Sequence, residues 1–228
     1  MPHADPTERI LAGAAALGVD LDEPRAARMH AHLELVRAAN ESFNLTRITD
    51  RDAMVRDHVL DALALLPALV AAGLEGSLAS PALDVGSGAG FPGIPLAIAR
   101  PDVGWILLES RGPKAAFLGE AVDVLQLPNV EVVQARARDL VHVEPAHAAI
   151  YRFVTARAVA HVARVLREVK ALVAPGGIVA HFKGPNYDAA EQTAGEAAAR
   201  EHHFEPTAEI PTTQPNRSRR FLFHRRTR

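Results

Sequence analysis

Residues 83–93 read LDVGSGAGFPG, and this stretch decides the fold. Apolar residues lead into Asp84, glycines alternate at Gly86, Gly88 and Gly90, and prolines follow. Glycine adopts positive φ and has no side chain, so such a turn lets the backbone pass close to a ligand. Proline is favoured in the first turn of a helix, where its missing N–H costs little. The stretch therefore predicts a buried strand, a tight turn that faces a ligand, and a helix.

The sequence that follows alternates between short apolar runs and longer helical patterns. This alternation is typical of βαβ units and therefore of a parallel sheet. In such sheets, ligands bind beyond the carboxyl ends of the strands. The expected strands cover residues 82–86, 105–109, 130–134, 153–156, 178–182 and 221–224, and the expected helices cover residues 95–99, 113–125 and 162–172.

The sequence before residue 80 has helical periodicity throughout. Apolar residues share one face in each of three segments. These residues are Ile10, Leu11, Ala14 and Leu17 in the first segment, Met29, Leu33 and Val36 in the second, and Val55, Val59 and Leu63 in the third. Residues 73–81 are expected to be a linker. We therefore expect a helical region over residues 1–78 that packs on a Rossmann-like core over residues 79–228.

A second acidic residue points to a nucleoside ligand. Glu109 ends the second expected strand, where an acid can accept hydrogen bonds from two ribose hydroxyls. Residues 88–93 also satisfy the dinucleotide pattern G-x-G-x-x-G, so an NAD-dependent oxidoreductase remains an alternative. Counted from Gly86 at the strand end, however, the third glycine of that pattern falls on Phe91, which leaves no room for pyrophosphate. With Asp84 before the glycines, the loop fits the pattern D-x-G-x-G-x-G of methyltransferases.

Composition excludes several kinds of chemistry. The 228 residues include no cysteine, so a disulfide framework, a thiolate nucleophile and a cysteine zinc site are excluded. The histidines lack acidic partners at metal-ligand spacing, so we expect no metal. The apolar stretch 62–74 is interrupted by Pro67 and is too short for a membrane span. The lack of cysteine suits the reducing cytoplasm, where we expect the protein to act. We expect a monomer, because one small domain without a coiled-coil seam has no evident means of self-association.

The charge is unevenly distributed along the chain. The formal net charge is −2, yet residues 216–228 contain six arginines and no acidic residue. Such a density of arginine attracts phosphate groups. A solvated basic tail is the alternative interpretation, and the sequence favours neither.

Further motifs follow one another in a fixed order along the chain. They are Phe43-Asn44-Leu45-Thr46, His58 with Leu60-Asp61, the block 84–95, Gly112-Pro113-Lys114 with Phe117-Leu118, Ala156-Arg157-Ala158, Pro175-Gly176-Gly177 and Lys183-Gly184. Together they resemble the bacterial small-subunit ribosomal RNA (guanine-N7) methyltransferase family, also called the glucose-inhibited division protein B family. The likeness is dense over about residues 40–184 and looser at the ends.

This resemblance implies a fold, a cofactor and a reaction. The fold would be α/β, the Rossmann-like class I methyltransferase fold, with a seven-stranded, mostly parallel sheet and N-terminal helices. The cofactor would be S-adenosyl-L-methionine, which leaves as S-adenosyl-L-homocysteine. The reaction would be methylation of N7 of one guanine in 16S rRNA, at the position numbered 527. The partner would be 16S rRNA or the small ribosomal subunit.

Site residues are also implied by position in the family's motifs. Arg157 would close the site after the fourth strand, and Ala137 with Arg138 would flank the adenine. Similar proteins usually carry an acid where this chain has Arg138, so only backbone atoms or Asp139 can bind the adenine amino group. The full set expected to bind the cofactor is Asp84, Gly86, Gly88, Gly90, Phe91, Glu109, Ala137, Arg138 and Arg157.

The expected reaction makes few demands on side chains. Guanine N7 has a lone pair and no proton to lose, so the enzyme needs no general base and must mainly align the reactants. Such alignment is worth about 7–11 kcal/mol. We expect Arg157 to act as the catalytic residue by donating to O6 or to a phosphate near the target guanine. A buried salt bridge is the alternative role for Arg157. His58 is expected to be a core or interdomain histidine.

Two other readings remain. Ribose 2′-O-methylation, with Lys114 or Lys183 as the proton acceptor, is the nearest enzymatic alternative. The other is a non-catalytic RNA-binding protein that has this fold. Transfer of methyl groups to small-subunit RNA would distinguish an enzyme from such a protein.

Overall fold

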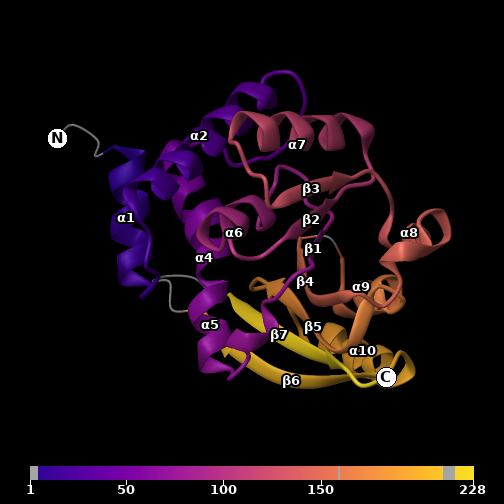
Figure 1. Ribbon diagram of the computed structural model, residues 1–228. Helices are drawn as coiled ribbons and strands as arrows, with labels where there is room; N and C mark the ends of the chain where they lie inside the picture. The colour runs from indigo at the N-terminus through magenta and orange to yellow at the C-terminus, as the bar shows by residue number, and fades with distance from the viewer. Residues whose placement is uncertain (1–4, 159, 213–218) are drawn as a thin grey trace.

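A seven-stranded sheet lies at the centre of the computed structural model, which describes residues 5–158, 160–212 and 219–228. The strand order is β3-β2-β1-β4-β5-β7-β6 (Figure 1). The first five strands are parallel, and β7 is antiparallel to both of its neighbours. The expected α/β fold with a seven-stranded, mostly parallel sheet is thus confirmed. The strands are β1 (Ala82–Val85), β2 (Trp105–Leu108), β3 (Val130–Val133), β4 (Tyr151–Arg157), β5 (Val173–Lys183), β6 (Phe204–Pro211) and β7 (Arg220–Arg226).

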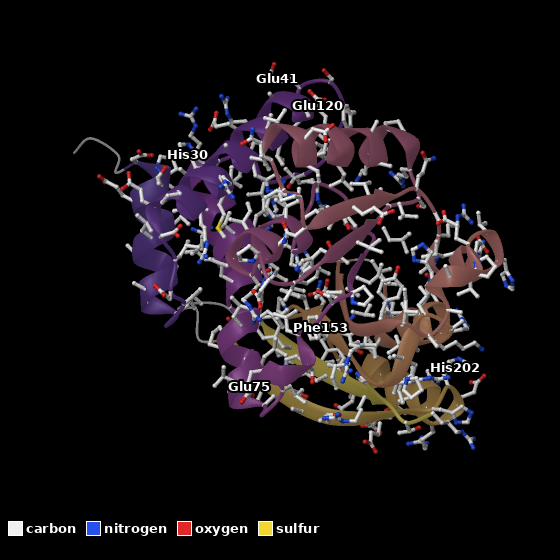
Figure 2. All side chains as sticks on the ribbon, in the orientation of Figure 1. His30, Glu41, Glu75, Glu120, Phe153 and His202 are labelled. Atoms are coloured by element: carbon white, nitrogen blue, oxygen red, sulfur yellow. The ribbon has the colours of Figure 1, made fainter. Side chains whose placement is uncertain are left out.

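The central strand β1 fixes the position of the glycine turn. All four of its residues are buried, and it pairs with β2 on one side and β4 on the other. Ala82 lies opposite Trp105 in β2 and opposite Phe153 in β4, the latter labelled in Figure 2. Both faces of the sheet are covered, which explains why the strand is apolar without alternation. The turn after β1 therefore lies beside the ends of β2 and β4.

Three of the C-terminal arginines, Arg220, Arg225 and Arg226, belong to the sheet. The expected strand at residues 221–224 is observed as the longer β7, which lies between β5 and β6. β6 was not expected from the sequence. It is the edge strand, its exposed residues alternate with partly buried ones in the second half, and it contains Pro206 and Pro211. Proline is tolerated at the edge of a sheet but weakens the strand signal in a sequence.

Helices precede the sheet and connect its strands. Those before the sheet are α1 (Pro6–Ala16), α2 (Glu23–Asn40), α3 (Arg51–Met54), the π-helix η1 (Val55–Leu60), α4 (Asp61–Leu63) and α5 (Leu65–Ala71). Those within the sheet region are α6 (Gly93–Ala99), α7 (Gly112–Val124), α8 (Ala137–Val143), α9 (Val162–Val169) and α10 (Ala189–Glu201). Neither α8 nor α10 was expected. Helix α9 ends earlier than expected because β5 begins at Val173.

The helices before the sheet share a core with the helices of the sheet. One buried cluster contains Ile10, Met29 and Val59 from the N-terminal region together with Ile94 of α6 and Phe117 of α7. The three apolar faces found in the sequence are therefore the contact faces of these helices. In Figure 1, α1, α2 and α4 cover the same side of the sheet as α6.

The segment expected to be a linker contains a short 3₁₀-helix, η2 (Glu75–Ser77), and leads directly into β1. A second 3₁₀-helix, η3 (Pro145–His147), precedes β4. Across the described part of the chain, no helix combines the length and the apolar character that a membrane span requires.

Candidate active site

The turn after β1 depends on glycine for its shape. Gly86, Gly88 and Gly90 have φ values of +68°, +59° and +90°. Residues with side chains rarely adopt this left-handed region. At Gly90 space is also limiting, because a Cβ atom would lie 2.9 Å from Nε2 of His32. The turn is therefore specified both by backbone conformation and by its contact with α2.

Asp84 joins this turn to the adjacent strand. Its carboxylate is fully buried, accepts a hydrogen bond from the Gly93 N–H at 3.1 Å, and accepts another from Oγ1 of Thr155 at 2.9 Å. Burial raises the pKa of Asp84 to about 6, and the hydrogen bonds oppose this shift. The side chain thus orients the backbone at the start of α6 and ties it to β4.

Glu109 lies against the same turn. Its Oε2 accepts a hydrogen bond from the Gly88 N–H at 3.0 Å, and its Oε1 accepts one from the Arg111 N–H at 2.9 Å. The strand β2 ends one residue earlier, at Leu108, so Glu109 extends from the carboxyl end of the sheet. Glycine turn and acid, predicted separately from the sequence, are in direct contact.

A cavity of about 370 Å³ opens at the carboxyl ends of β1, β2 and β3. This volume is within the range of small-molecule sites. Residues from each of the three strand ends and from α9 line it, including Gly86, Ser110, Arg111, Ala137, Arg138 and Arg164. Its place agrees with the rule that ligands of open α/β sheets bind beyond the carboxyl ends of the strands.

Arg138 lies on the rim of this cavity, in the first turn of α8. Its Nε is 3.5 Å from Oδ1 of Asp139, and both side chains are about half exposed (54% and 50%). An ion pair between such exposed groups contributes little to stability. Both side chains remain available to a ligand or to solvent, so this ion pair is not needed to hold the fold together.

Phe91 lies apart from the residues that line the cavity. Its ring is buried and stacks on His58, with 4.4 Å between ring centroids and 14° between planes. The ring of His32 lies 4.6 Å from that of Phe91, and the guanidinium carbon of Arg157 lies 5.6 Å from its centroid. The Phe91 side chain therefore contacts the N-terminal helices and the end of β4.

Arg157, at the end of β4, is held by groups from the N-terminal helices. Its Nη1 donates to Oδ2 of Asp61 at 2.9 Å and to the Asp57 carbonyl at 3.2 Å, and its Nη2 donates to Nδ1 of His58 at 2.7 Å. The side chain is 12% exposed. Burial lowers the pKa of Arg157, and the charge of Asp61 opposes this shift. This geometry is that of the buried salt bridge considered as the alternative role.

Asp61 is a residue of this site that appears in a family motif of the sequence but to which the sequence assigned no role. Its Oδ2 also accepts a hydrogen bond from Arg219 at 2.7 Å, so one carboxylate joins β4 to the start of β7. His58 and Asp61 are three residues apart, and residues at that spacing share one face of a helix. This spacing is the signal in the sequence that could have identified Asp61.

Lys183 has an internal role in the fold. Its Nζ donates to Oε1 of Glu191 at 2.5 Å and to the Ala160 carbonyl at 3.0 Å. The same carboxylate oxygen accepts the Val162 N–H at 3.0 Å, at the start of α9. A lysine used as a donor in this way stabilises the turn between β4 and α9, which does not favour it as a proton acceptor. Among the residues described, no cluster of three or more His, Asp or Glu could hold a metal ion.

Comparisons with known proteins identify the family of this chain. Residues 25–219 match the model of the GidB family, described as rRNA small subunit methyltransferase G. The chain is 41% identical over 177 residues to ribosomal RNA small subunit methyltransferase G of Neisseria meningitidis, an alignment that covers 78% of this chain and 79% of the relative. It is 40% identical over 185 residues to the protein of the same name from Stenotrophomonas maltophilia, which covers 80% of each.

A solved structure agrees on the fold. A SAM-dependent methyltransferase from Aquifex aeolicus superimposes with a TM-score of 0.57 at 16% identity, covering 78% of this chain and 99% of that one. Likeness at this level of identity concerns the fold alone. The chain belongs to the rRNA small subunit methyltransferase G family.

Proposed function

We propose that this chain uses S-adenosyl-L-methionine to methylate N7 of a guanine in 16S rRNA of the small ribosomal subunit, the guanine numbered 527. The observation that carries the proposal is the contact between the glycine turn and Glu109, where the Gly88 N–H donates to Oε2 at 3.0 Å. Gly86 of that turn and Ser110, the neighbour of Glu109, line the cavity. Family membership supports the choice of RNA as substrate.

The residues around the cavity fit the nucleoside part of this cofactor. The turn at Gly86 presents backbone without side chains, and Glu109 keeps lone pairs on both oxygens that can accept ribose hydroxyls. The small side chain of Ala137 leaves room for an adenine ring on that wall of the cavity. Backbone atoms of Arg138, or the carboxylate of Asp139, then bind the adenine amino group. When bound, the cofactor supplies an electrophilic methyl group.

The chain's own residues would mainly align the reactants. Because N7 has no proton to lose, this reaction does not require an acid and base pair. Arg157 and Arg219 share the carboxylate of Asp61, and Arg219 is the more exposed, at 28% against 12%. We expect these two guanidinium groups to face the RNA base, and Arg157 to donate to O6 or to a nearby phosphate.

The topology argues against the NAD-dependent alternative. Dinucleotide-binding sheets have the parallel order 3-2-1-4-5-6. Here the antiparallel strand β7 is inserted between β5 and β6. The internal hydrogen bonds of Lys183 argue similarly against Lys183 as the proton acceptor of a 2′-O-methyltransferase.

One assay separates these possibilities. The purified protein is incubated with methyl-labelled cofactor and small subunits from a strain that lacks this gene, and the RNA is then cleaved chemically at N7-methylguanine. We expect label in 16S rRNA and one new cleavage position. Label that resists this cleavage and protects a ribose from alkaline hydrolysis would indicate 2′-O-methylation. Absence of label, together with a change in NADH fluorescence, would indicate an oxidoreductase.

A variant tests the assignment of Arg157. Arg157→Ala should lower methyl transfer and leave the dissociation constant of S-adenosyl-L-methionine nearly unchanged, as measured by calorimetry. Arg164→Ala is the matched control, because that arginine lines the cofactor cavity and pairs with Glu168 on α9. Equal loss of cofactor affinity and turnover in Arg157→Ala would contradict a role on the RNA side.

The C-terminal arginines supply a further test of RNA binding. Arg217 lies outside the described residues, whereas Arg220 pairs with Glu209 and Arg225 lies partly exposed in β7. If they contact phosphates, the affinity for RNA should fall steeply with salt, and each neutralised contact should reduce the slope by about 0.7–0.9. If the dependence of RNA affinity on salt did not change, these arginines would have only a structural role. A ribosomal substrate is consistent with a monomer acting in the cytoplasm, which light scattering and fractionation can test.

A further inference from the structure

His58 has a hydrogen-bond pattern that fixes the state of its ring. Nδ1 lies 2.7 Å from Nη2 of Arg157, and a guanidinium can only donate, so Nδ1 must accept. The proton of the neutral ring is therefore on Nε2, which lies 3.0 Å from Oγ1 of Thr46. That hydroxyl oxygen also accepts the Ile48 N–H at 3.1 Å. The ring is a neutral link between the segment before α3 and the end of β4.

The same ring is also the stacking partner of Phe91. The two planes differ by 14° at a centroid distance of 4.4 Å, and His58 and Phe91 are only 5% and 6% exposed. Phe91 lies in the turn that ends at α6, whose backbone Asp84 holds through Gly93. One side chain therefore contacts both the turn on the cofactor side and the arginine on the substrate side.

The local backbone brings three acceptors to one guanidinium. The π-helix η1 spans Val55–Leu60 and is followed at once by Asp61. The Asp57 carbonyl, Nδ1 of His58 and Oδ2 of Asp61 all accept hydrogen bonds from Arg157. Single π-helical turns are rare and are frequently found at functional sites. Arg157 is thus held by three acceptors, and the ring of one of them, His58, also stacks on Phe91.

We infer that His58 is a positioning residue for methyl transfer, because its neutral ring sets Arg157 and Phe91 in one geometry and so aligns the substrate side of the site with the cofactor side. The inference rests on the proposed function and adds a residue to it. His58 itself touches neither the cofactor cavity nor the exposed rim of the site. Small errors of alignment are costly in such a reaction, since a misplacement of about 1 Å can lower the rate about 10²-fold.

Two substitutions test the two interactions of His58 separately, namely the hydrogen bond that Nδ1 accepts from Arg157 and the stacking of the ring on Phe91. His58→Phe keeps a ring beside Phe91 and removes the acceptor for Arg157, whereas His58→Asn keeps an acceptor near the position of Nδ1 and removes the ring. His30→Phe is the matched control. His30 also bonds a threonine hydroxyl, because its Nδ1 lies 3.1 Å from Oγ1 of Thr7. It is on α2 (Figure 2), however, and this bond joins α2 to α1, away from Arg157.

Turnover and cofactor affinity are measured for each variant with small subunits as substrate. We expect His58→Phe to lower kcat by about 10²-fold, with the dissociation constant of S-adenosyl-L-methionine changed less than about 3-fold by calorimetry, and His58→Asn to recover part of kcat. His30→Phe should match the wild type. Wild-type kcat in a folded His58→Phe, or a parallel loss of cofactor affinity, would overturn the inference. An inactive wild type would instead refute the proposed function.

A readout independent of activity covers the case in which His58→Phe does not fold. Nitrogen NMR of histidine-labelled protein, assigned with Thr46→Val, reports which ring nitrogen carries the proton. We expect an Nε2-protonated, neutral His58 near pH 7, and Thr46→Val should shift the Nε2 resonance while the protein remains folded. A ring protonated on Nδ1, or a cationic ring at that pH, would overturn the inference.

Discussion

Acidification should destabilise this protein through buried histidines, and His32 is the clearest case. The ring lies in α2, is fully buried, and places Nε2 2.8 Å from the Ala89 carbonyl. A carbonyl only accepts, so Nε2 carries the proton, while Nδ1 has no hydrogen-bond partner among the described residues. Burial lowers the pKa of His32 to about 4, and the bond to Ala89 opposes the shift. Protonation of the folded protein at this position is therefore costly.

The magnitude follows from the shift. Well above pH 6.5, His32 is neutral in both states and contributes no pH dependence. As the pH falls below 6.5, the unfolded chain binds the proton first, and the free energy of unfolding falls until the pH reaches about 4. At 1.36 kcal/mol per pKa unit, the loss is about 3 kcal/mol, a large part of a total stability of about 5–15 kcal/mol.

Other buried groups titrate in the same range, so a difference measurement is needed. Burial also lowers the pKa of His224 to about 4, which adds a loss of the same sign. Asp84 acts in the opposite direction. Its pKa is raised to about 6. The protonated carboxyl group therefore contributes its full stabilisation below pH 3.8, and this stabilisation is lost as the pH rises through about 6. Comparison with a variant that changes only His32 cancels both contributions.

The variant is His32→Gln, whose amide can still donate to Ala89 but does not titrate. Urea unfolding of both proteins is followed by circular dichroism from about pH 7 to about pH 4.5. Wild-type stability should fall relative to the variant by about 2–3 kcal/mol over this range. His142→Gln is the control, because that ring is exposed. A constant difference between wild type and His32→Gln across the range would refute the reasoning.

Two further substitutions test the site. Gly93→Ala would place a Cβ atom 2.3 Å from Cδ2 of Leu107, so thermal unfolding should show a loss of about 1–3 kcal/mol, whereas Gly76→Ala, with open space around it, should change stability little. A Gly93→Ala protein as stable as the wild type would contradict the packing described. Asp61→Asn should cost about 3–5 kcal/mol in urea unfolding because it leaves buried arginine charge poorly compensated, while Glu209→Gln, at an exposed pair, should cost less than about 1 kcal/mol. Equal effects of these two changes would show that the buried carboxylate has no special role.

Much of the core of the fold is predictable from short stretches of sequence. β1 and β2 begin where their apolar runs begin, and each ends one residue earlier than expected, at Val85 and Leu108. Strands that are buried on both faces have continuous apolar sequences, which makes them visible without structural context. β6 is half exposed and contains prolines, and α10 is rich in alanine with few apolar residues to mark a face, so neither had a comparable signal.

The sequence by itself determined the strand, turn and helix of residues 83–93 and the acid at Glu109, because positive φ at glycine and apolar burial are local properties. Only the tertiary structure decided the surroundings of Arg157. Its partner Asp61 is 96 residues away in the chain, and Arg219, which shares that carboxylate, is 158 residues from Asp61. Contacts at such separations depend on which buried surfaces meet when the helices pack on the sheet, and no local pattern records that choice.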